Sequence, residues 1–277
     1  RLRLDLVLSA RQINAIRLGV MIPAPVHTEI RRRIRAAEAE HRVQVLLAVE
    51  SGSRAWGFES PNSDFDARFI YVHERDWYFS IDDKRDVIEY PIVDDIDLNG
   101  WELRKALRLF RNSNPAFVEW IQSPIVYLEQ GSFAPACREL LPTIYSCLRG
   151  IHHYRSMAKT NYRGYLREDL VPLKKYFYVL RPLLSVRWLE TYGRPAPIEF
   201  HKLLHLIDGQ PDLIADIHKL LERKRAAPEM GLAPQVTSIH AFIEAELQRL
   251  ESLGLEPWQR VDNATERLNE VFARCLR

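Results

Sequence analysis

Two aspartates stand in an apolar stretch of the sequence, "SDFDARFIYV", residues 63–72. Side chains alternate between the two faces of a β-strand, so Asp64 and Asp66 would project from one face while Phe65 turns into the core. Two carboxylates so close repel each other unless a cation lies between them, and hard cations prefer carboxylate oxygens. The spacing therefore predicts a site for Mg²⁺, with Mn²⁺ as the alternative ion.

A third carboxylate is available in "VDDIDLNG", residues 93–100. Asp97 has apolar neighbours on both sides and would point alone from one face of a strand, and Asp95 would share that face two residues earlier. Asp97 is the first choice, and Asp95 is the alternative. Three carboxylates from two adjacent strands can hold two metal ions, which stabilise the attacking and leaving oxygens of a phosphoryl displacement.

A Gly-Ser pair precedes the aspartates in "ESGSRAWGF", residues 50–58. Gly52 at the end of a strand would let the backbone approach a ligand closely. The Ser53 hydroxyl and the amides of the following turn could donate hydrogen bonds to a polyphosphate, and Arg54 could pair with the same phosphates. This segment therefore predicts a phosphate-binding turn beside the metal site.

A basic and aromatic stripe is expected further along the chain, in "LKKYFYVLR", residues 173–181. Lys174, Tyr178 and Arg181 fall at i, i+4 and i+7 of a helix and so share one face. That face could lie across the cleft, with the cations contacting phosphates and the tyrosine stacking on a base. The alternative is an amphipathic helix with a solvated basic side.

The elements that would position these residues follow from the periodicity of apolar residues. A helix is expected at about 25–40, and strands are expected at 43–49, 64–72, 86–92, 94–98 and 125–128. From Gly100 the apolar period changes from two to that of a helix. Helices are expected from about 103, then at 142–167, 171–192, 198–206, 211–225, 238–252 and 259–276.

These patterns predict an α+β fold, with a mixed sheet and flanking helices followed by an all-helical lobe. We divide the chain into an N-terminal extension of uncertain status (residues 1–24), a catalytic domain (25–130) and a helical domain (131–277).

Charge is distributed unevenly along the 277 residues, although the formal net charge is only +2. Residues 59–98 hold twelve acidic and four basic side chains, whereas residues 101–194 hold fifteen basic and seven acidic ones. This asymmetry fits a metal centre facing a lobe that holds phosphates, or two solvated faces of opposite sign. The three scattered cysteines favour a cytoplasmic protein, and the absence of a long apolar run argues against a membrane role.

Several motifs in the same order carry a family resemblance. The strand, the Gly-Ser pair, the Asp-x-Asp strand and the later aspartate resemble the DNA polymerase beta-like nucleotidyltransferase superfamily. More narrowly, the two quoted segments at 50–58 and 63–72, together with "NGWELRKALRLF", "SNPAFVEWIQSPIVY" and "KKYFYVLRPLL", resemble an RNA repair pathway nucleotidyltransferase family that is associated with RNA ligases. The resemblance extends from about residue 43 to residue 250.

The resemblance implies the transfer of a nucleoside monophosphate from an NTP to a hydroxyl group, with release of pyrophosphate. It implies that Asp64 and Asp66 bind the metal ions, that Gly52 and Ser53 hold phosphates, and that Asp97 helps to deprotonate the acceptor. It also implies RNA as the acceptor and an RNA ligase of the same pathway as a partner. Two alternatives stay open, which are a protein or small-molecule acceptor, and a catalytically silent module that binds nucleotides or RNA.

Overall fold

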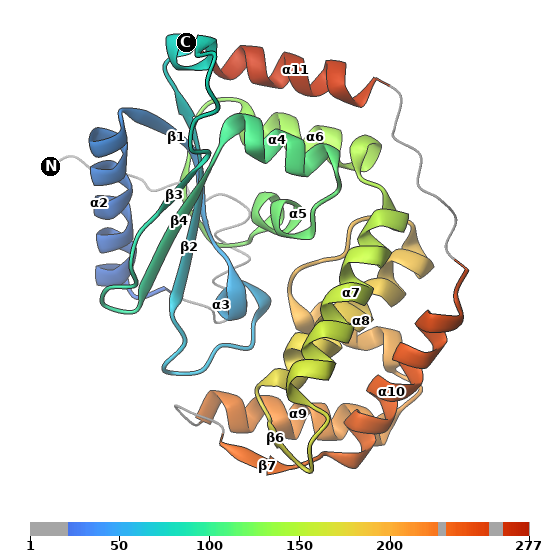
Figure 1. Ribbon diagram of the computed structural model, residues 1–277. Helices are drawn as coiled ribbons and strands as arrows, with labels where there is room; N and C mark the ends of the chain where they lie inside the picture. Colours follow the sequence, from blue (N-terminus) through green and yellow to red (C-terminus); the bar gives the residue numbers. More distant parts are fainter. Residues whose placement is uncertain (1–21, 227–230, 255–262, 277) are drawn as a thin grey trace, which may run out of the picture.

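The computed structural model describes residues 22–226, 231–254 and 263–276 and shows an α+β protein (Figure 1). A five-stranded sheet carries helices on both faces, and most of the later elements are helices. In chain order the elements are α2 (Ala24–His41), β1 (Val43–Glu50), α3 (Gly52–Trp56), β2 (Phe65–His73), η1 (Arg75–Phe79), β3 (Val87–Glu89), β4 (Ile96–Glu102), α4 (Leu103–Arg111), α5 (Pro115–Gln122), β5 (Val126–Glu129), α6 (Phe133–Ile144), α7 (Cys147–Tyr165), β6 (Leu170–Pro172), α8 (Lys175–Tyr192), η2 (Phe200–Ile207), α9 (Pro211–Ala226), β7 (Leu232–Pro234), α10 (Thr237–Ser252) and α11 (Ala264–Cys275).

The sheet has the strand order β3-β4-β2-β1-β5. It is mixed, because β2 and β4 run parallel while the other neighbouring pairs are antiparallel. Helix α2 covers one face, and α4, α5 and α6 cover the other (Figure 1). The parallel pair at the centre brings the beginning of β2 next to the beginning of β4, although the two strands are not consecutive in the sequence.

The alternation of side chains along each strand divides the apolar residues between two cores. From β2, Phe69 and Tyr71 pack into the smaller core under α2, whereas Ile70 and Val72 pack into the larger core. The larger core is continuous from the sheet through α4 and α5 to α7 and α8. The sheet and the later helices are therefore joined by one buried apolar cluster rather than by a linker.

Strand β4 begins later and runs further than the sequence predicts. Asp94 and Asp95 have φ angles of 53° and 59°, which places both in the left-handed region that a tight turn requires. Arg33 of α2 holds this turn through an ion pair of 2.6 Å to Asp94. The strand therefore begins only at Ile96, and the expectation that Asp95 lies on a strand beside Asp97 was wrong.

The second half of the chain differs from the prediction in two respects. The helix expected at 142–167 is two helices, because Pro142 lies inside α6 and the chain turns between Ile144 and Cys147 before α7 begins. The lobe is also not all-helical, since β6 and β7 form a small antiparallel sheet where a helix had been expected from residue 171. Part of the helix expected at 259–276 lies outside the described residues, and α11 begins at Ala264.

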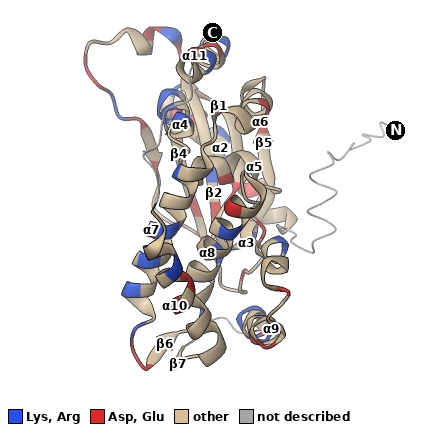
Figure 2. Cartoon of the chain, turned by 90° about the vertical axis from the view of Figure 1, so that its right-hand side faces the viewer, with Lys and Arg blue, Asp and Glu red and all other residues tan. Residues whose placement is uncertain are grey.

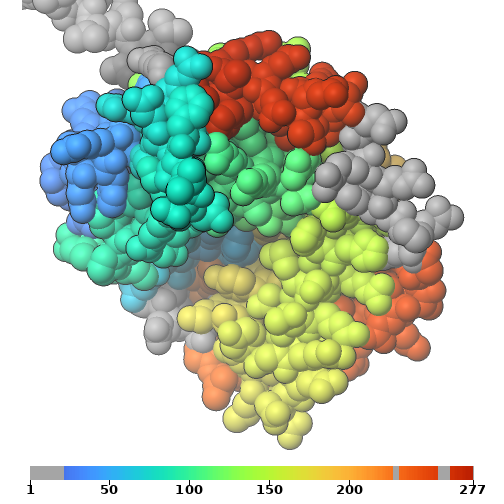
Figure 3. All heavy atoms as spheres, turned by 45° about the horizontal axis from the view of Figure 1, so that its top comes forward, coloured from blue at the N-terminus to red at the C-terminus, as the bar shows by residue number. Residues whose placement is uncertain are grey.

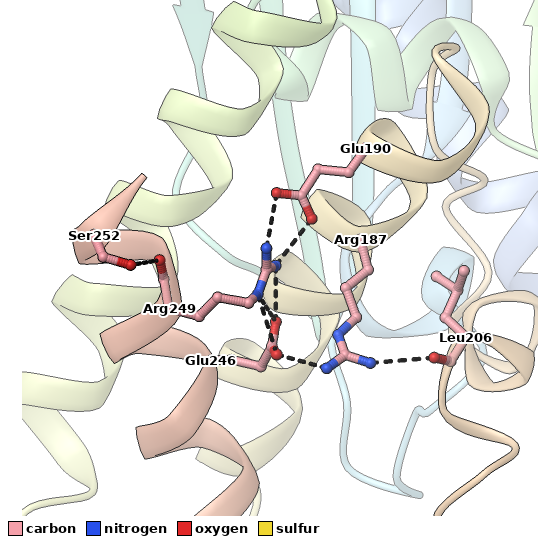
Figure 4. Close-up of polar contacts among 6 residues, drawn as sticks. All are labelled: Arg187, Glu190, Leu206, Glu246, Arg249 and Ser252. Carbon is pink, nitrogen blue, oxygen red and sulfur yellow. Dashed lines mark hydrogen bonds and ion pairs between the residues drawn. The ribbon is translucent and has the colours of Figure 1, made fainter. Parts of the chain in front are cut away.

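Helices α8 and α10 are joined by a network of charged side chains (Figure 4). Arg249 pairs with Glu190 at 2.9 Å and with Glu246 at 3.0 Å, and Arg187 pairs with the same Glu246 at 2.5 Å. Glu246 is buried, so its charge needs these two guanidinium partners. The network fixes the packing of α10 against α8. Of these two helices, α8 is the one that approaches the end of the sheet.

The last helix returns to the sheet. α11 packs against α4 and α6, and it lies across them in Figure 1. α6, which begins after residue 130, packs against β1 and α5. The division at residue 130 stays a prediction, and elements from beyond it contribute to the packing around the sheet. In the described parts of the chain, no helix is both long and apolar enough to cross a membrane.

Candidate active site

The parallel pairing of β2 and β4 brings two of the predicted carboxylates together. Asp66 and Asp97 are direct partners in the register, so both side chains leave the same face of the sheet. Asp64 lies one residue before β2 and is exposed. Burial raises the pKa of Asp66, and the charges of Asp97 and Asp64 raise it further against the lowering effect of Arg68. The three aspartates are thus within electrostatic reach of one another.

An arginine that the sequence analysis did not single out lies between two of these carboxylates. The Arg68 guanidinium donates to Asp66 at 2.9 Å and to Asp97 at 2.6 Å, and it also donates to the Asp97 carbonyl at 2.7 Å. Asn99 donates to the other oxygen of Asp97. The spacing Asp-x-Arg at residues 66–68 was a usable signal, because Arg68 must share a strand face with Asp66.

Gly52 lies directly against the Asp66 carboxylate. Its φ is +61°, and a Cβ atom added there would be 1.9 Å from Asp66 Oδ2. The backbone before Gly52 is tied to β2, since the Ser51 amide donates to the Asp66 carbonyl at 2.9 Å. Only glycine fits this position, because both the backbone angle and the close approach exclude a side chain. Ser53 follows in the first turn of α3 and is buried.

Arg54 lies in the site but is held by the chain itself. It donates to the Ser63 carbonyl at 2.6 Å and to the Asp64 carbonyl at 3.2 Å. Its guanidinium carbon is 3.9 Å from the centre of the Phe65 ring. These contacts clamp the loop that enters β2 and thereby position Asp64.

A buried glutamate holds the backbone of Asp66. Glu50, at the end of β1, accepts hydrogen bonds from the Asp66 amide at 2.9 Å and from the Tyr127 hydroxyl. Burial raises the pKa of the Glu50 carboxyl to about 8, which outweighs the lowering effect of these two hydrogen bonds. A protonated carboxyl here avoids an additional negative charge beneath the aspartates.

The predicted stripe on α8 is divided by the structure. Tyr178 approaches the aspartates, since the charges of Asp66 and Asp64 add to the effect of burial in raising its pKa. Lys174 precedes the first residue of α8 and is exposed.

Arg181, the third member of the stripe, lies in the interior. Its side chain is 4% exposed, pairs with Glu119 at 2.6 Å and lies over the Trp56 ring at 4.1 Å. The expected free cation facing phosphates is therefore not what the geometry shows, because Arg181 lies on the buried part of α8 among mostly apolar residues.

Two cations from α9 reach the turn after α3, and no local sequence signal pointed to them. The Lys224 amine is buried and donates to the Phe58 carbonyl, and Arg225 donates to the preceding carbonyl at 2.9 Å. Burial lowers the pKa of Lys224 to about 8, and the nearby charges of Lys174, Arg225 and Arg54 lower it further against the effect of a neighbouring glutamate. The fold thus gathers cations from three distant segments beside the Gly-Ser turn, and the basic colouring of this region is visible in Figure 2.

The donor set matches the chemistry of Mg²⁺ in part. Asp66 and Asp97 present carboxylate oxygens side by side, and Asp64 stands at the entrance of β2. Within residues 22–226, 231–254 and 263–276, no three His, Cys, Asp or Glu side chains gather closely enough to form a ready metal cluster. Two paired carboxylates with a third nearby are what the chain offers a divalent cation.

Comparison with known proteins adds three findings. A family model described as the RNA repair pathway DNA polymerase beta family matches residues 26–274. The uncharacterized protein YcgL of Bacillus subtilis (strain 168) is 44% identical over 243 residues, which cover 88% of this chain and 94% of that protein. A crystal structure of a nucleotidyltransferase-like protein from Exiguobacterium sibiricum aligns over 88% of both chains with 13% identity and a TM-score of 0.32, a value too low to support an inference.

Proposed function

Because the chain belongs to the RNA repair pathway DNA polymerase beta family, we propose that it transfers a nucleoside monophosphate from an NTP to a hydroxyl acceptor and releases pyrophosphate. The observation that carries this proposal is the register of the parallel strands. This register pairs Asp66 with Asp97, and Asp66 also lies directly against Gly52 and near Tyr178. Carboxylates, a close-approach glycine and an aromatic ring at one end of a sheet suit a nucleoside triphosphate and a metal ion.

In this reaction the acceptor oxygen forms a bond to the α-phosphorus, and the bond from that phosphorus to the bridging oxygen breaks. The electron pair leaves with pyrophosphate. Asp97 is the group proposed to receive the hydroxyl proton, and Asp66, Asp64 and Asp97 would hold Mg²⁺ or Mn²⁺. Such an ion supplies charge neutralisation for the triphosphate. Arg68 neutralises Asp66 and Asp97 in this structure, and a cation would compete with it for the same oxygens.

The remaining positioning is provided by side chains around the turn. Gly52 and the start of α3 let the backbone approach the phosphates, while Lys174 and Lys224 supply positive charge from the helical part of the chain. Tyr178 packs edge-on against Trp56 at 5.9 Å and presents an aromatic surface for the base. Arg54 acts indirectly, through the loop that it clamps before β2.

RNA is the acceptor that we favour, and a row of side chains that starts at Tyr178 and continues to α7 supports it. The Lys175 amine lies 4.9 Å from the centre of the Tyr178 ring and 4.0 Å from that of Tyr165, which is 44% exposed at the end of α7. Residues 140–167 contain no acidic side chain, and Figure 2 shows basic residues along α7. Alternating cations and aromatic rings are typical of surfaces that bind single strands.

The reaction is tested by incubating the protein with each NTP labelled at the α-phosphate, with Mg²⁺ or Mn²⁺, and with RNA, protein or small-molecule acceptors. We expect label on RNA, and we expect Asp66→Asn and Asp97→Asn to abolish it, while Asp95→Asn remains active. Label on a protein or small molecule instead would refute the RNA acceptor. NTP binding without transfer to any acceptor would favour a silent binding module.

The acceptor surface has its own test. Replacing Tyr165 by alanine should weaken RNA binding by about 5-fold to 150-fold, the range that corresponds to one lost base-stacking contact, with NTP binding unchanged. Tyr192→Ala is the matched control, since Tyr192 is 43% exposed at the far end of α8 and bonds to His205. Equal effects of both substitutions would refute this surface.

A further inference from the structure

A second candidate binding site lies between α4 and α11. The two helices enclose a groove of about 350 Å³. Figure 3 shows α11 lying over the green residues that include α4, and the two helices are in contact. The groove is at the opposite end of β4 from Asp97, because α4 begins directly after Glu102. At roughly 3.3 Å per strand residue, the distance along β4 from Asp97 to Glu102 is already about 16 Å.

Three arginines from α4 line the groove. Arg104, Arg108 and Arg111 are spaced at i, i+4 and i+7 and so share one face of the helix. In the described parts of the chain, none of the three lies within ion-pair distance of a carboxylate, and no Asp or Glu lines the groove. Like charges that converge without counter-charges are unfavourable, and an anion in the groove would relieve their repulsion.

Two of these guanidiniums are oriented by their surroundings. Arg111 donates to Thr265 of α11 at 3.3 Å, while its buried Nε has no hydrogen-bond partner within the described residues. Arg104 lies over the rings of Tyr78 and Phe272, at 5.0 Å and 5.4 Å. Because this Nε is closed to solvent, a ligand in the groove would meet the terminal nitrogens of the guanidiniums. Arg108 also lines the groove and is exposed.

Apolar side chains line part of the groove on both helices. Leu107 of α4 lies beside the arginines, and Leu268 and Phe272 of α11 line the other side together with the polar Thr265 and Asn269. Guanidinium groups match the geometry of phosphate oxygens, and an apolar wall suits an aromatic or aliphatic body. A volume of about 350 Å³ is at the lower end of the range for small-molecule sites. We propose that this groove binds a small phosphate monoester with an apolar part, of the chemical class of a mononucleotide, independently of the nucleotidyl-transfer site.

Equilibrium dialysis with labelled AMP tests the proposal by counting the molecules bound per chain. Charge reversal by Arg108→Glu should remove one bound AMP, or weaken that site at least about tenfold, because one charge-assisted contact is replaced by repulsion. Arg274→Glu is the matched control, since Arg274 is exposed on α11 but does not line the groove. Inorganic phosphate should compete for this site, and adenosine, which lacks the phosphate, should not bind it.

The outcomes separate this proposal from the one above. If the nucleotidyl-transfer site also binds AMP, Arg108→Glu lowers the count from two to one. If the nucleotidyl-transfer site does not bind AMP, the number of AMP molecules bound per chain falls from one to zero. In both cases Arg108→Glu binds one AMP fewer than the unchanged protein. Unchanged binding in Arg108→Glu refutes the groove, as does an equal loss in Arg274→Glu or binding of adenosine as tight as that of AMP. Melting temperatures without ligand confirm that both variants fold.

Discussion

Gly52 and Gly57 lie at the two ends of α3 and together provide a test of the site geometry. Both have positive φ angles, of 61° and 81°. They differ in their surroundings, because a Cβ atom at Gly52 would lie 1.9 Å from Asp66 Oδ2, whereas a Cβ atom at Gly57 would meet nothing within 4 Å. Alanine at either position strains the backbone, and alanine at Gly52 also displaces the Asp66 carboxylate.

The magnitudes follow from these two terms. An L-residue in the left-handed region costs about 1–2 kcal/mol, so both substitutions should lower the free energy of unfolding by at least that amount. A carbon and an oxygen rarely approach closer than about 3.3 Å, so relief of the contact at Gly52 requires a movement of about 1.4 Å. A displacement of about 1 Å at a reacting group can reduce the rate about 100-fold.

Urea denaturation and nucleotidyl transfer measure the two effects separately. We expect Gly57→Ala to lose stability but to transfer nucleotide within a few-fold of the unchanged protein. We expect Gly52→Ala to lose more stability and at least about 100-fold in transfer. If both variants lose transfer equally, or if Gly52→Ala remains active, the contact between Gly52 and Asp66 does not position the carboxylate and the reasoning fails.

Three further predictions concern charges around the site. Arg68→Met leaves Asp66 and Asp97 without their shared cation, so the melting temperature should fall at pH 7 and should fall less at pH 4. Mg²⁺ should restore the melting temperature at pH 7. A fall that neither the lower pH nor Mg²⁺ reverses contradicts this prediction. The pKa of Glu50 is raised to about 8, so the folded protein keeps a proton that the unfolded chain has released. As pH rises between about 5 and 8, this group therefore lowers the free energy of unfolding by up to about 1.4 kcal/mol per pH unit. Glu50→Gln should flatten that slope in denaturation curves, and an unchanged slope contradicts the assignment. Arg181→Met alone should lower the free energy of unfolding by about 3–5 kcal/mol because it leaves the Glu119 charge buried without a partner. The double variant Arg181→Met with Glu119→Gln should recover part of this stability. An equal loss of stability in the double variant refutes a structural ion pair.

The candidate site was predictable where it depends on the period of a single strand. The alternation of side chains implies that Asp66 shares a strand face with Arg68, and the Gly-Ser pair opens α3. Asp64, which was expected on the same strand, lies one residue before β2. The choice between Asp95 and Asp97 was not predictable in this way, because it depends on where β4 begins. The left-handed turn at Asp94 and Asp95 moves that beginning to Ile96.

Residues on the helices show a different limit. Periodicity indicates that Lys174, Tyr178 and Arg181 share a face, but it does not say whether that face meets solvent, the cleft or another helix. Because α8 is buried around most of its circumference, Arg181 lies against Glu119 instead of in the cleft. Likewise, nothing near Lys224 in the sequence indicates that it reaches Phe58, which is 166 residues earlier.

The sequence by itself determined the residue types of the site, the alternation that aligns them on a strand, and the family that the chain belongs to. Local spacing is sufficient for the first two features, since a strand or a helix repeats over a few residues, whereas the family follows from a match over residues 26–274. Only the tertiary structure decided that β2 and β4 are parallel neighbours, that Asp66 faces Asp97 across Arg68, and that cations from α9 join the Gly-Ser turn. These contacts join distant segments, and their pairing depends on how the whole apolar core packs.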